Sequence, residues 1–491
     1  MTAEILINAG AGEVRIAHLC HGRLQDFRVE RVIGDDDGTR HCHSHIGDIM
    51  LGRVQRVMAG MQAAFVDVGL ERAGFLGLRE AKMLARTPCS EPTISDCVRE
   101  GDAVLVQVIK DPIGEKGARL SAGITLPGRL LVMTPGQEGV ALSRRIEDET
   151  QRNAFFALGE QLLADTDCDL FKGVGFIFRT AAQDACLDDL RQDALALADV
   201  WRCIQERRTS AKPPIMLYRD LGPIERAMRD VVRGDVKRVL IDDAAAAEAA
   251  RNYCRKAMPG AEASIELTGR DLFDRYGLED EIATLFEPKI NLPSGGWITV
   301  ETTEALTAVD VNSGRFLQSG GLEETSLAVN LEAAAEIGRQ LRLRGIGGLI
   351  VVDFIHLSQS AHAERVLEAL RHSLSFDRAP VQISPMTEFG IVAITRKRLR
   401  EPLVRRASLP CRACDGRGRA RSAEGRALEV LRQVEREAVA NPGAELVVRV
   451  APEVAAWLER HAEAVSSGLA RRGAGRVRFE GGEGGANAGQ S

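Results

Sequence analysis

Two stretches of the chain decide its fold. Residues 297–311 read WITVETTEALTAVDV and residues 348–355 read GLIVVDFI, and both predict short strands in which an apolar run ends on an aspartate. Residues 322–344 have apolar side chains every three or four positions and predict a long helix between them. Strands separated by a helix are typical of an α/β layer, and a second helix predicted over 361–374 extends the pattern.

The two aspartates are the strongest candidates for catalysis. Asp310 ends the first run, Asp353 ends the second, and Asn312 shares a strand face with Asp310. If the two strands are neighbours, the carboxylates lie close together and favour a cation between them. Mg²⁺ is the natural candidate because one or two carboxylates usually hold it, and it can activate water against a phosphodiester. The simpler interpretation is that each aspartate only caps the following turn or helix.

The first 122 residues predict β-structure. Strands over 4–8, 14–18 and 25–32 suggest an antiparallel meander, with which residues 224–286 are expected to pack. Glycine-rich strands between residues 47 and 110 follow and suggest a small barrel of the OB type.

The barrel carries a possible nucleic-acid surface. Phe65 and Phe75 could stack on bases, and Lys116 could neutralise a phosphate beside them. The alternative is that both phenylalanines are core residues of the barrel. Farther along, Arg179 and Thr180 follow an apolar run and would suit a terminal phosphate. On the residues alone, a solvent-facing strand end is the simpler interpretation of this pair.

Cys411 and Cys414 form the only CxxC pair among the ten cysteines. They supply two of the four ligands that a structural Zn²⁺ site needs, and a second copy of the chain could supply the other two. This interpretation predicts a dimer linked by shared zinc. One alternative is a turn without metal, and the other completes the site with His41, Cys42, His43 and His45.

Composition narrows the classes of function. The 491 residues suffice for about three domains. Lys and Arg number 64 and Asp and Glu number 70, a formal net charge of −6, which excludes a globally basic nucleic-acid binder. Positive charge must therefore be local: in the barrel, around Arg179 and in the basic run 396–406. With no apolar stretch of the ~18 residues that a membrane span needs and no signal-peptide pattern, we expect a cytoplasmic protein with reduced cysteines.

Taken together, these segments resemble the ribonuclease E/G family of endoribonucleases, and most of all its shorter, ribonuclease G-type members. The resemblance covers nearly the whole chain. It rests above all on GRVQRVMAGMQAAFVDVGLERAGFLGL (52–78), IKDPIGEKGARLSAGITLPGRLLVM (109–133), LPSGGWITVETTEALTAVDVNSGRF (292–316) and CRACDGRGR (411–419).

The resemblance implies a multidomain α/β and α+β architecture. Its parts are an RNase H-like subdomain (1–43 and 222–285), an inserted OB-fold RNA-binding barrel (44–122), a 5′-sensor subdomain (123–221), a DNase I-like catalytic subdomain (286–407), a zinc link (408–420) and a small C-terminal domain with a disordered tail (421–491).

The resemblance also implies an activity. It is Mg²⁺-dependent cleavage of single-stranded RNA that leaves a 5′-phosphate and a 3′-hydroxyl, with roles in 16S rRNA maturation and mRNA decay and with homodimers or tetramers. By motif match, Asp310 and Asp353 would hold Mg²⁺, Asn312 would orient Asp310, and Cys411 and Cys414 would share zinc between subunits. Residues matched to RNA contact are Phe65, Phe75 and Lys116, and those matched to a pocket for a 5′-monophosphate are Gly128, Val132, Arg179 and Thr180.

Some positions depart from the family pattern. Pro380 stands where the sensor pocket usually has a basic residue, which predicts a weaker preference for a 5′-monophosphate. His356 replaces a commonly acidic residue, Ala393 replaces a glutamate, and the usual Cys-Pro-x-Cys is Cys-Arg-Ala-Cys.

Two competing functions stay open at this point. One is metal-independent cleavage by attack of a 2′-hydroxyl, with His356, His362 or His372 as base; it would leave a cyclic phosphate. The other is a non-catalytic RNA-binding or ribosome-assembly factor that keeps the fold.

Overall fold

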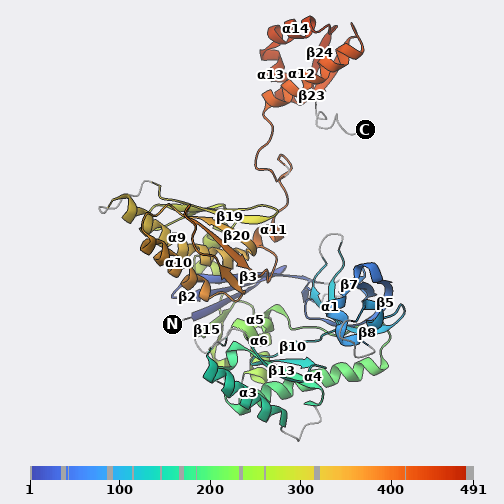
Figure 1. Ribbon diagram of the computed structural model, residues 1–491, viewed down its shortest axis with the longest axis vertical. Helices are drawn as coiled ribbons and strands as arrows, with labels where there is room; N and C mark the ends of the chain where they lie inside the picture. The colour runs from blue at the N-terminus through green and yellow to red at the C-terminus, as the bar shows by residue number, and fades with distance from the viewer. Residues whose placement is uncertain are drawn as a thin grey trace. The chain divides into compact units, whose positions relative to one another are not determined.

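The computed structural model describes residues 3–482 except 35–39, 43, 86–91, 113–115, 144, 145, 147, 165–170, 184, 232–235, 259, 260, 315–320 and 415. The chain divides into two compact units, Met1–Arg406 and Ala407–Ser491 (Figure 1). Both mix helices and strands, which confirms the multidomain α/β class. Of the helices described, none is both long and apolar enough to cross a lipid bilayer.

The first sheet joins the N-terminal strands to a distant segment, in the order β16-β15-β1-β2-β3-β4. Its β1–β4 part is an antiparallel meander, and β15 and β16 continue it in parallel, which confirms that residues after 224 pack with the N-terminal strands. Ile5 and Ile7 pack with α5 and α6, whereas Leu6 packs with α7 and α8, so both faces of β1 are covered. The elements are β1 (Ala3–Ala9), β2 (Glu13–Cys20), β3 (Arg23–Gly34), β4 (Arg40–Cys42), α5 (Pro223–Val231), β15 (Val236–Ile241), α6 (Ala244–Ala257), β16 (Ile265–Leu267), α7 (Leu272–Arg275) and α8 (Leu278–Thr284).

The second sheet is the predicted barrel. Five strands close in the order β5-β6-β7-β9-β8, with β8 paired back to β5, and β14 adds to the start of β5. Gly117 lets the chain before β9 approach β7, because a Cβ there would lie 2.0 Å from the carbonyl oxygen of Ala73. The elements are β5 (Ile49–Met58), β6 (Ala63–Asp67), β7 (Gly74–Gly77), α1 (Leu78–Ala81), α2 (Ile94–Cys97), β8 (Ala103–Lys110), β9 (Arg119–Ser121) and β14 (Ile215–Tyr218).

The third sheet, in the order β10-β11-β13-β12, shares its core with the barrel. Leu131, Phe176 and Leu190 belong to the same buried cluster as the barrel residues Ile49 and Leu105. The elements are β10 (Leu126–Pro127), β11 (Leu131–Pro135), β12 (Gly139–Leu142), α3 (Glu149–Ala164), β13 (Val174–Phe178) and α4 (Leu187–Ser210).

The fourth sheet contains the two stretches that decide the fold, in the order β17-β18-β19-β20-β22-β21. Helices α9 and α10 pack against one face of it, where Val309 and Val352 are buried, and leave the other face open (Figure 1). Strand β20 ends at Asp353, two residues before the predicted end, because Asn330 of α9 binds the backbone of Ile355 instead. The elements are β17 (Lys289–Asn291), β18 (Trp297–Thr302), β19 (Leu306–Asn312), α9 (Leu322–Arg344), β20 (Gly348–Asp353), α10 (Ser360–Ser375), β21 (Val381–Ile383), β22 (Ile391–Arg396) and α11 (Leu403–Ala407).

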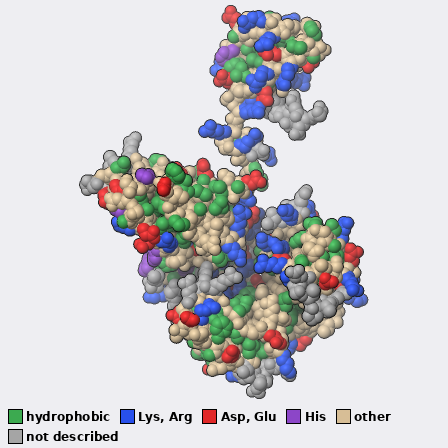
Figure 2. All heavy atoms as spheres, viewed as in Figure 1, with side chains coloured by type: hydrophobic (Ala, Val, Ile, Leu, Met, Phe, Trp, Pro, Cys, Tyr) green, Lys and Arg blue, Asp and Glu red, His purple; other side chains and the backbone are tan. Residues whose placement is uncertain are grey.

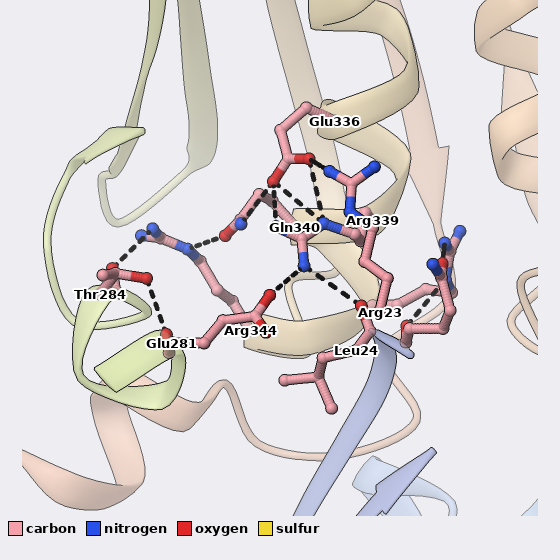
Figure 3. Close-up of polar contacts among 10 residues, drawn as sticks. Arg23, Leu24, Glu281, Thr284, Glu336, Arg339, Gln340 and Arg344 are labelled. Atoms are coloured by element: carbon pink, nitrogen blue, oxygen red, sulfur yellow. Dashed lines mark hydrogen bonds and ion pairs between the residues drawn. The ribbon is translucent and has the colours of Figure 1, made fainter. Parts of the chain in front are cut away.

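A buried ionic network fastens α9 to the first sheet (Figure 3). The Glu336 carboxylate accepts hydrogen bonds from Arg23 of β3 at 2.7 Å, from Arg339 at 2.6–3.1 Å and from Gln340 at 2.8 Å. Arg339 also pairs with Glu281 of α8 and donates to a backbone carbonyl of β3. The helix behind the fourth sheet is thereby fixed to the N-terminal part of the chain.

The second unit contains a parallel pair of strands, β23 and β24, whose buried cluster includes Ala427, Val454 and Leu458. Its elements are α12 (Ala423–Ala440), β23 (Leu446–Val450), α13 (Pro452–Arg460), α14 (Ala462–Arg471) and β24 (Val477–Gly481).

Candidate active site

The two candidate catalytic aspartates lie side by side. Strands β19 and β20 are parallel neighbours, and Asp310 is the register partner of Asp353. Paired strands run about 4.8 Å apart, so both carboxylates emerge together from the open face of the sheet, where both residues are exposed. The Asn312 side chain donates to Asp310 Oδ2 at 2.7 Å. The expectations that the strands are neighbours and that Asn312 reaches Asp310 are both confirmed.

Neither carboxylate is used structurally within the described part of the chain. There, neither accepts a hydrogen bond from a backbone N–H, so the interpretation as caps finds no support, and neither forms an ion pair with Lys or Arg. Among the described residues, no group of three or more His, Cys, Asp or Glu could hold a metal ion. A pair of oxygen donors nonetheless fits Mg²⁺, which keeps most of its waters.

Helix α9 holds the backbone that follows Asp353. Asn330, fully buried, donates to the carbonyl of Ile355 at 2.7 Å and accepts from its N–H at 3.0 Å. Glu323 accepts from the backbone N–H groups of Ser358 and Gln359 at 3.0 and 3.2 Å. Sequence reasoning missed both residues, although a polar Asn330 among the apolar positions of a predicted helix was an available signal.

The three histidines proposed as alternative bases do not converge. His362 Nδ1 lies 2.9 Å from Glu323 Oε1, and the hydrogen bonds from the Ser358 N–H and His362 lower the pKa of Glu323 to about 2. His372 lies in the last turn of α10 and packs edge-on against Phe376, about 15 Å along the helix from His362. His356 is exposed in the loop after β20.

The aromatic residues of the barrel lie on its outer face. Phe65 and Phe75 are register partners on β6 and β7, with ring centroids 6.0 Å apart at an interplanar angle of 76°. Both are partly exposed, whereas their neighbours Val66 and Leu76 are buried. The interpretation of both phenylalanines as core residues is therefore wrong, because strand alternation directs them outwards.

Cationic side chains flank the two rings. Arg56 of β5 pairs in register with Phe65, and Arg119 of β9 pairs with Phe75, so four neighbouring strands carry one row of side chains. Exposed Lys116 lies close by, since the chain two residues later accepts the Phe75 N–H at 2.7 Å. Figure 2 shows Lys and Arg side chains on the visible face of the barrel. Sequence reasoning missed both arginines, whose cross-strand register is revealed only by the paired strands.

The predicted phosphate-sensing residues lie on or just after strands β10, β11 and β13 of the third sheet. Arg179 donates to the carbonyl of Gly128 and to Asp230 Oδ1, the latter at 2.8 Å. Val132 of β11 pairs with Ile177 of β13, and Thr180 directly follows Arg179. The interpretation of Arg179 as a solvent-facing strand end is wrong, because Asp230 of α5 binds its guanidinium.

A carboxylate already occupies the turn beside Arg179. Asp193 of α4 accepts from the backbone N–H groups of residues 129, 130 and 131 at 3.2, 2.9 and 2.9 Å. A Cβ at Gly128 would lie 2.6 Å from this carboxylate, so the turn requires glycine. Although burial raises the pKa of Asp230, Arg229 and Arg179 hold it well below its usual range. The pocket therefore offers one guanidinium whose charge is partly balanced.

Most of the basic run 396–406 is structural, which corrects its interpretation as an RNA-facing surface. Arg396 is buried and forms a two-pronged pair with Asp377 at 2.7 and 3.0 Å. Arg400 donates to the carbonyl of Arg342 at 2.6 Å, and Arg406 donates to the carbonyl of Val29 at 2.6 Å. These arginines bind carbonyl and carboxylate oxygens of other segments of the chain.

Cys411 is exposed and Cys414 half-buried at the start of the second unit. Hydrogen bonds from the backbone N–H groups of Ala413 and Cys414 lower the pKa of the Cys411 thiol. Accessible thiols in a tight turn suit Zn²⁺, but within the described residues they have no third ligand. Of the rival ligand set, His43 lies outside the described residues.

Three of the residues that depart from the family pattern, His356, Pro380 and Ala393, lie on or beside the strands of the fourth sheet. Pro380 is exposed before β21, whereas Arg179 follows β13 of the third sheet. Ala393 of β22 pairs with Val351 of β20.

Comparison with known proteins agrees with this geometry. The model described as "Ribonuclease E/G family" matches residues 125–399, and the one described as "RNase E/G, Thioredoxin-like domain" matches residues 410–480. Ribonuclease G of Salmonella typhimurium (strain SL1344) and of Escherichia coli (strain K12) are each 37% identical over 470 residues, covering 94% of this chain and 93% of their own. Ribonuclease E of Haemophilus influenzae is 35% identical over 480 residues, covering 96% of this chain and 49% of its own. With family motifs along most of its length and an in-register pair of aspartates at its centre, the chain belongs to the ribonuclease E/G family of endoribonucleases.

Proposed function

We propose that this endoribonuclease hydrolyses single-stranded RNA in a Mg²⁺-dependent reaction that leaves a 5′-phosphate and a 3′-hydroxyl. The observation that carries the proposal is the register pair Asp310 and Asp353 on an open sheet face, without a cationic partner among the described residues. When bound, Mg²⁺ supplies a Lewis acid that activates water and neutralises charge on the scissile phosphate.

The residues of the chain position the ion and the carboxylates that would bind it. Asp310 and Asp353 would hold the ion, and the amide of Asn312 keeps the Asp310 carboxylate in one orientation. Asn330 and Glu323 fix the backbone that follows Asp353. The open face leaves room for a phosphodiester above both carboxylates. Holding the reacting groups in this way supplies much of the rate in phosphoryl chemistry.

The barrel would bind the RNA. The row of Arg56, Phe65, Phe75 and Arg119, with Lys116 beside it, alternates rings that stack on bases with cations that meet phosphates. Stacking needs splayed bases, which favours single-stranded over duplex RNA. We assign the barrel to the OB type, the first sheet to an RNase H-like subdomain and the fourth to a DNase I-like subdomain.

Arg179 with Gly128, Val132 and Thr180 would sense the 5′ end. Arg179 is held by Asp230 and has N–H groups left for a phosphate. Because Asp230 balances part of its charge, and because Pro380 replaces a basic residue, we expect only a modest preference for a 5′-monophosphate. The ratio of cleavage rates on 5′-monophosphate and 5′-hydroxyl RNA measures it; a ratio above about a hundredfold would contradict this expectation.

Cys411 and Cys414 would complete a zinc site with the same pair of a second subunit, giving a homodimer that could pair further into a tetramer. The Cys411→Ser/Cys414→Ser variant should lose zinc and sediment as a smaller species. An unchanged oligomer and a zinc-free wild type would refute the link. By family resemblance, rRNA precursors and mRNA in the cytoplasm are the proposed substrates.

Two variants test the reaction. Asp310→Asn and Asp353→Asn should each slow single-turnover cleavage at saturating RNA by at least about a hundredfold, whereas Glu301→Gln, an exposed carboxylate on β18, should not. Product ends should carry a 5′-phosphate, and EDTA should stop the reaction. Wild-type rates in both aspartate variants would refute the catalytic assignment. A cyclic phosphate in the presence of EDTA would support the histidine alternative instead.

A further inference from the structure

One aromatic ring near the candidate active site is exposed although a rigid turn holds it. Phe389 is 79% exposed between β21 and β22. Turns of this length usually carry glycine, proline, asparagine, aspartate or serine, because an exposed ring gains nothing from folding. Among the described residues of the first unit, Phe389 has the most exposed large hydrophobic side chain.

The turn itself is well braced. The Thr387 N–H donates to the carbonyl of Ile391 at 2.9 Å, and the Gly390 N–H donates to the carbonyl of Thr387 at 3.0 Å. The Thr387 hydroxyl accepts the Ile391 N–H at 3.1 Å. Gly390 has φ +83°, and a Cβ there would lie 2.7 Å from the carbonyl oxygen of Phe354, so the turn is locked against its neighbour. The backbone that carries the ring is therefore held in one conformation.

The turn that carries Phe389 lies next to the end of β20, where Asp353 is found. The Phe354 N–H, which directly follows Asp353, donates to the carbonyl of Gly390 at 3.2 Å. Ile391 is the register partner of Asp353, and Phe389 lies two residues before it. An RNA strand bound at Asp353 therefore has the turn that carries Phe389 as a neighbour.

The chemistry beside the ring selects a base. Glu388 precedes Phe389, is exposed, and would repel a phosphate. A base is uncharged, and its face stacks on an aromatic ring whatever its identity. We propose that Phe389 forms a base-stacking subsite for a nucleotide that flanks the scissile phosphate. The inference rests on the proposed cleavage of single-stranded RNA at Asp310 and Asp353.

The test removes the ring and the base separately. Binding of short single-stranded RNAs is measured in EDTA and their cleavage in Mg²⁺, with an abasic nucleotide placed in turn at each position around the cut. Phe389→Ala should weaken binding of intact RNA by about 5- to 30-fold, the lower part of the range for a base on an aromatic ring. Phe389→Trp should bind as the wild type does, with its fluorescence quenched by RNA.

The decisive result is non-additivity. At one abasic position, wild-type affinity should fall by the same factor by which Phe389→Ala lowers affinity for intact RNA. The affinity of Phe389→Ala should not fall further when the base at that position is removed. Phe376→Ala is the matched control, since that ring is 57% exposed at the far end of α10, and it should bind as the wild type does.

Three outcomes would overturn the subsite. They are wild-type binding by Phe389→Ala, additive losses at every abasic position, and a change in sedimentation of Phe389→Ala with RNA binding intact, which would assign the ring to an interface between copies. If the wild type fails to cleave in Mg²⁺, the proposed function fails, yet the binding measurements in EDTA still decide the role of the ring.

Discussion

Replacing Glu336 by alanine should destabilise the first unit strongly. Its carboxylate, 6% exposed, is the acceptor shared by Arg23, Arg339 and Gln340 at the centre of the network in Figure 3. Arg339 is itself only 11% exposed. Removing the carboxylate therefore leaves a buried guanidinium short of one counter-charge and a buried amide without its acceptor.

The structure sets the size of the effect. Removing one partner of a buried ion pair costs about 3–5 kcal/mol. Arg339 keeps Glu281 and a backbone carbonyl, so the lower end applies, about 3 kcal/mol. Unfolding entropy is about 2.1 cal/mol/K per residue, so in the Met1–Arg406 unit that loss lowers the thermal midpoint by about 3–4 °C.

The assay is thermal and urea unfolding of the full chain, with two comparisons. Glu364→Ala breaks a surface pair in which Glu364 and Arg371 are 56% and 49% exposed, and should change stability by less than about 1 kcal/mol. The double variant Glu336→Leu/Arg339→Met should recover part of the loss, because no guanidinium is then buried without its counter-charge, although Gln340 still lacks its acceptor. If Glu336→Ala and Glu364→Ala unfold at the same temperature and urea concentration, the Glu336 network does not act as a buried ion pair.

Three further substitutions probe the local supports of the site and barrel. Asn330→Ala leaves both backbone groups of Ile355 unpaired and should cost about 3 kcal/mol, read as a lower thermal midpoint. Glu323 has a lowered pKa, so the stability that its ionised form contributes is complete above pH 4.5 and is lost as the pH falls towards about 2. The difference in thermal midpoint between the wild type and Glu323→Gln should therefore shrink over that interval. A difference that stays constant with pH would contradict this role. Gly117→Ala should unfold the barrel earlier because its Cβ meets a backbone oxygen at 2.0 Å, whereas Gly12→Ala, with nothing within 4 Å, should be neutral by circular dichroism melting.

Much of the fold could be predicted because it depends on local pattern. The bounds Trp297–Thr302 and Leu322–Arg344 follow from apolar spacing that one strand or one helix must bury. Parallel pairing of β19 and β20 follows in turn, because a helix connects them. The early end of β20 could not be predicted, since it depends on Asn330, a side chain 25 residues away that binds the strand's continuation.

The site was predictable only as far as sequence neighbours define it. Asp310, Asn312 and Asp353 stand out because each lies at a strand end, and register then brings them together. Arg56 and Arg119 do not stand out, because their place beside Phe65 and Phe75 depends on the register between paired strands.

The basic run 396–406 shows that sequence alone can also suggest a surface that the fold does not expose. The run 396–406 is conspicuously basic, yet Arg396 is buried against Asp377 and Arg400 binds the carbonyl of Arg342. A cluster of arginines in sequence measures how many guanidinium groups are present, and it does not say whether they face solvent. With much of this run used internally, fewer of its cations remain for RNA, so binding should depend on salt through few phosphate contacts.

Helix α9 connects these observations. Its first half holds the backbone after Asp353 through Glu323 and Asn330, and its second half is fastened to the N-terminal sheet through Glu336 and Arg339. A buried ion pair is weak evidence for added stability, since an apolar pair of similar volume often does as well. What such a pair does supply is a defined register, because only one placement of the helix satisfies every donor. A one-residue shift of α9 would turn Asn330 about 100° away from Ile355 and release the backbone beside the carboxylate pair. The position of the candidate Mg²⁺ site at Asp310 and Asp353 is therefore set partly by ion pairs at the opposite end of the same helix.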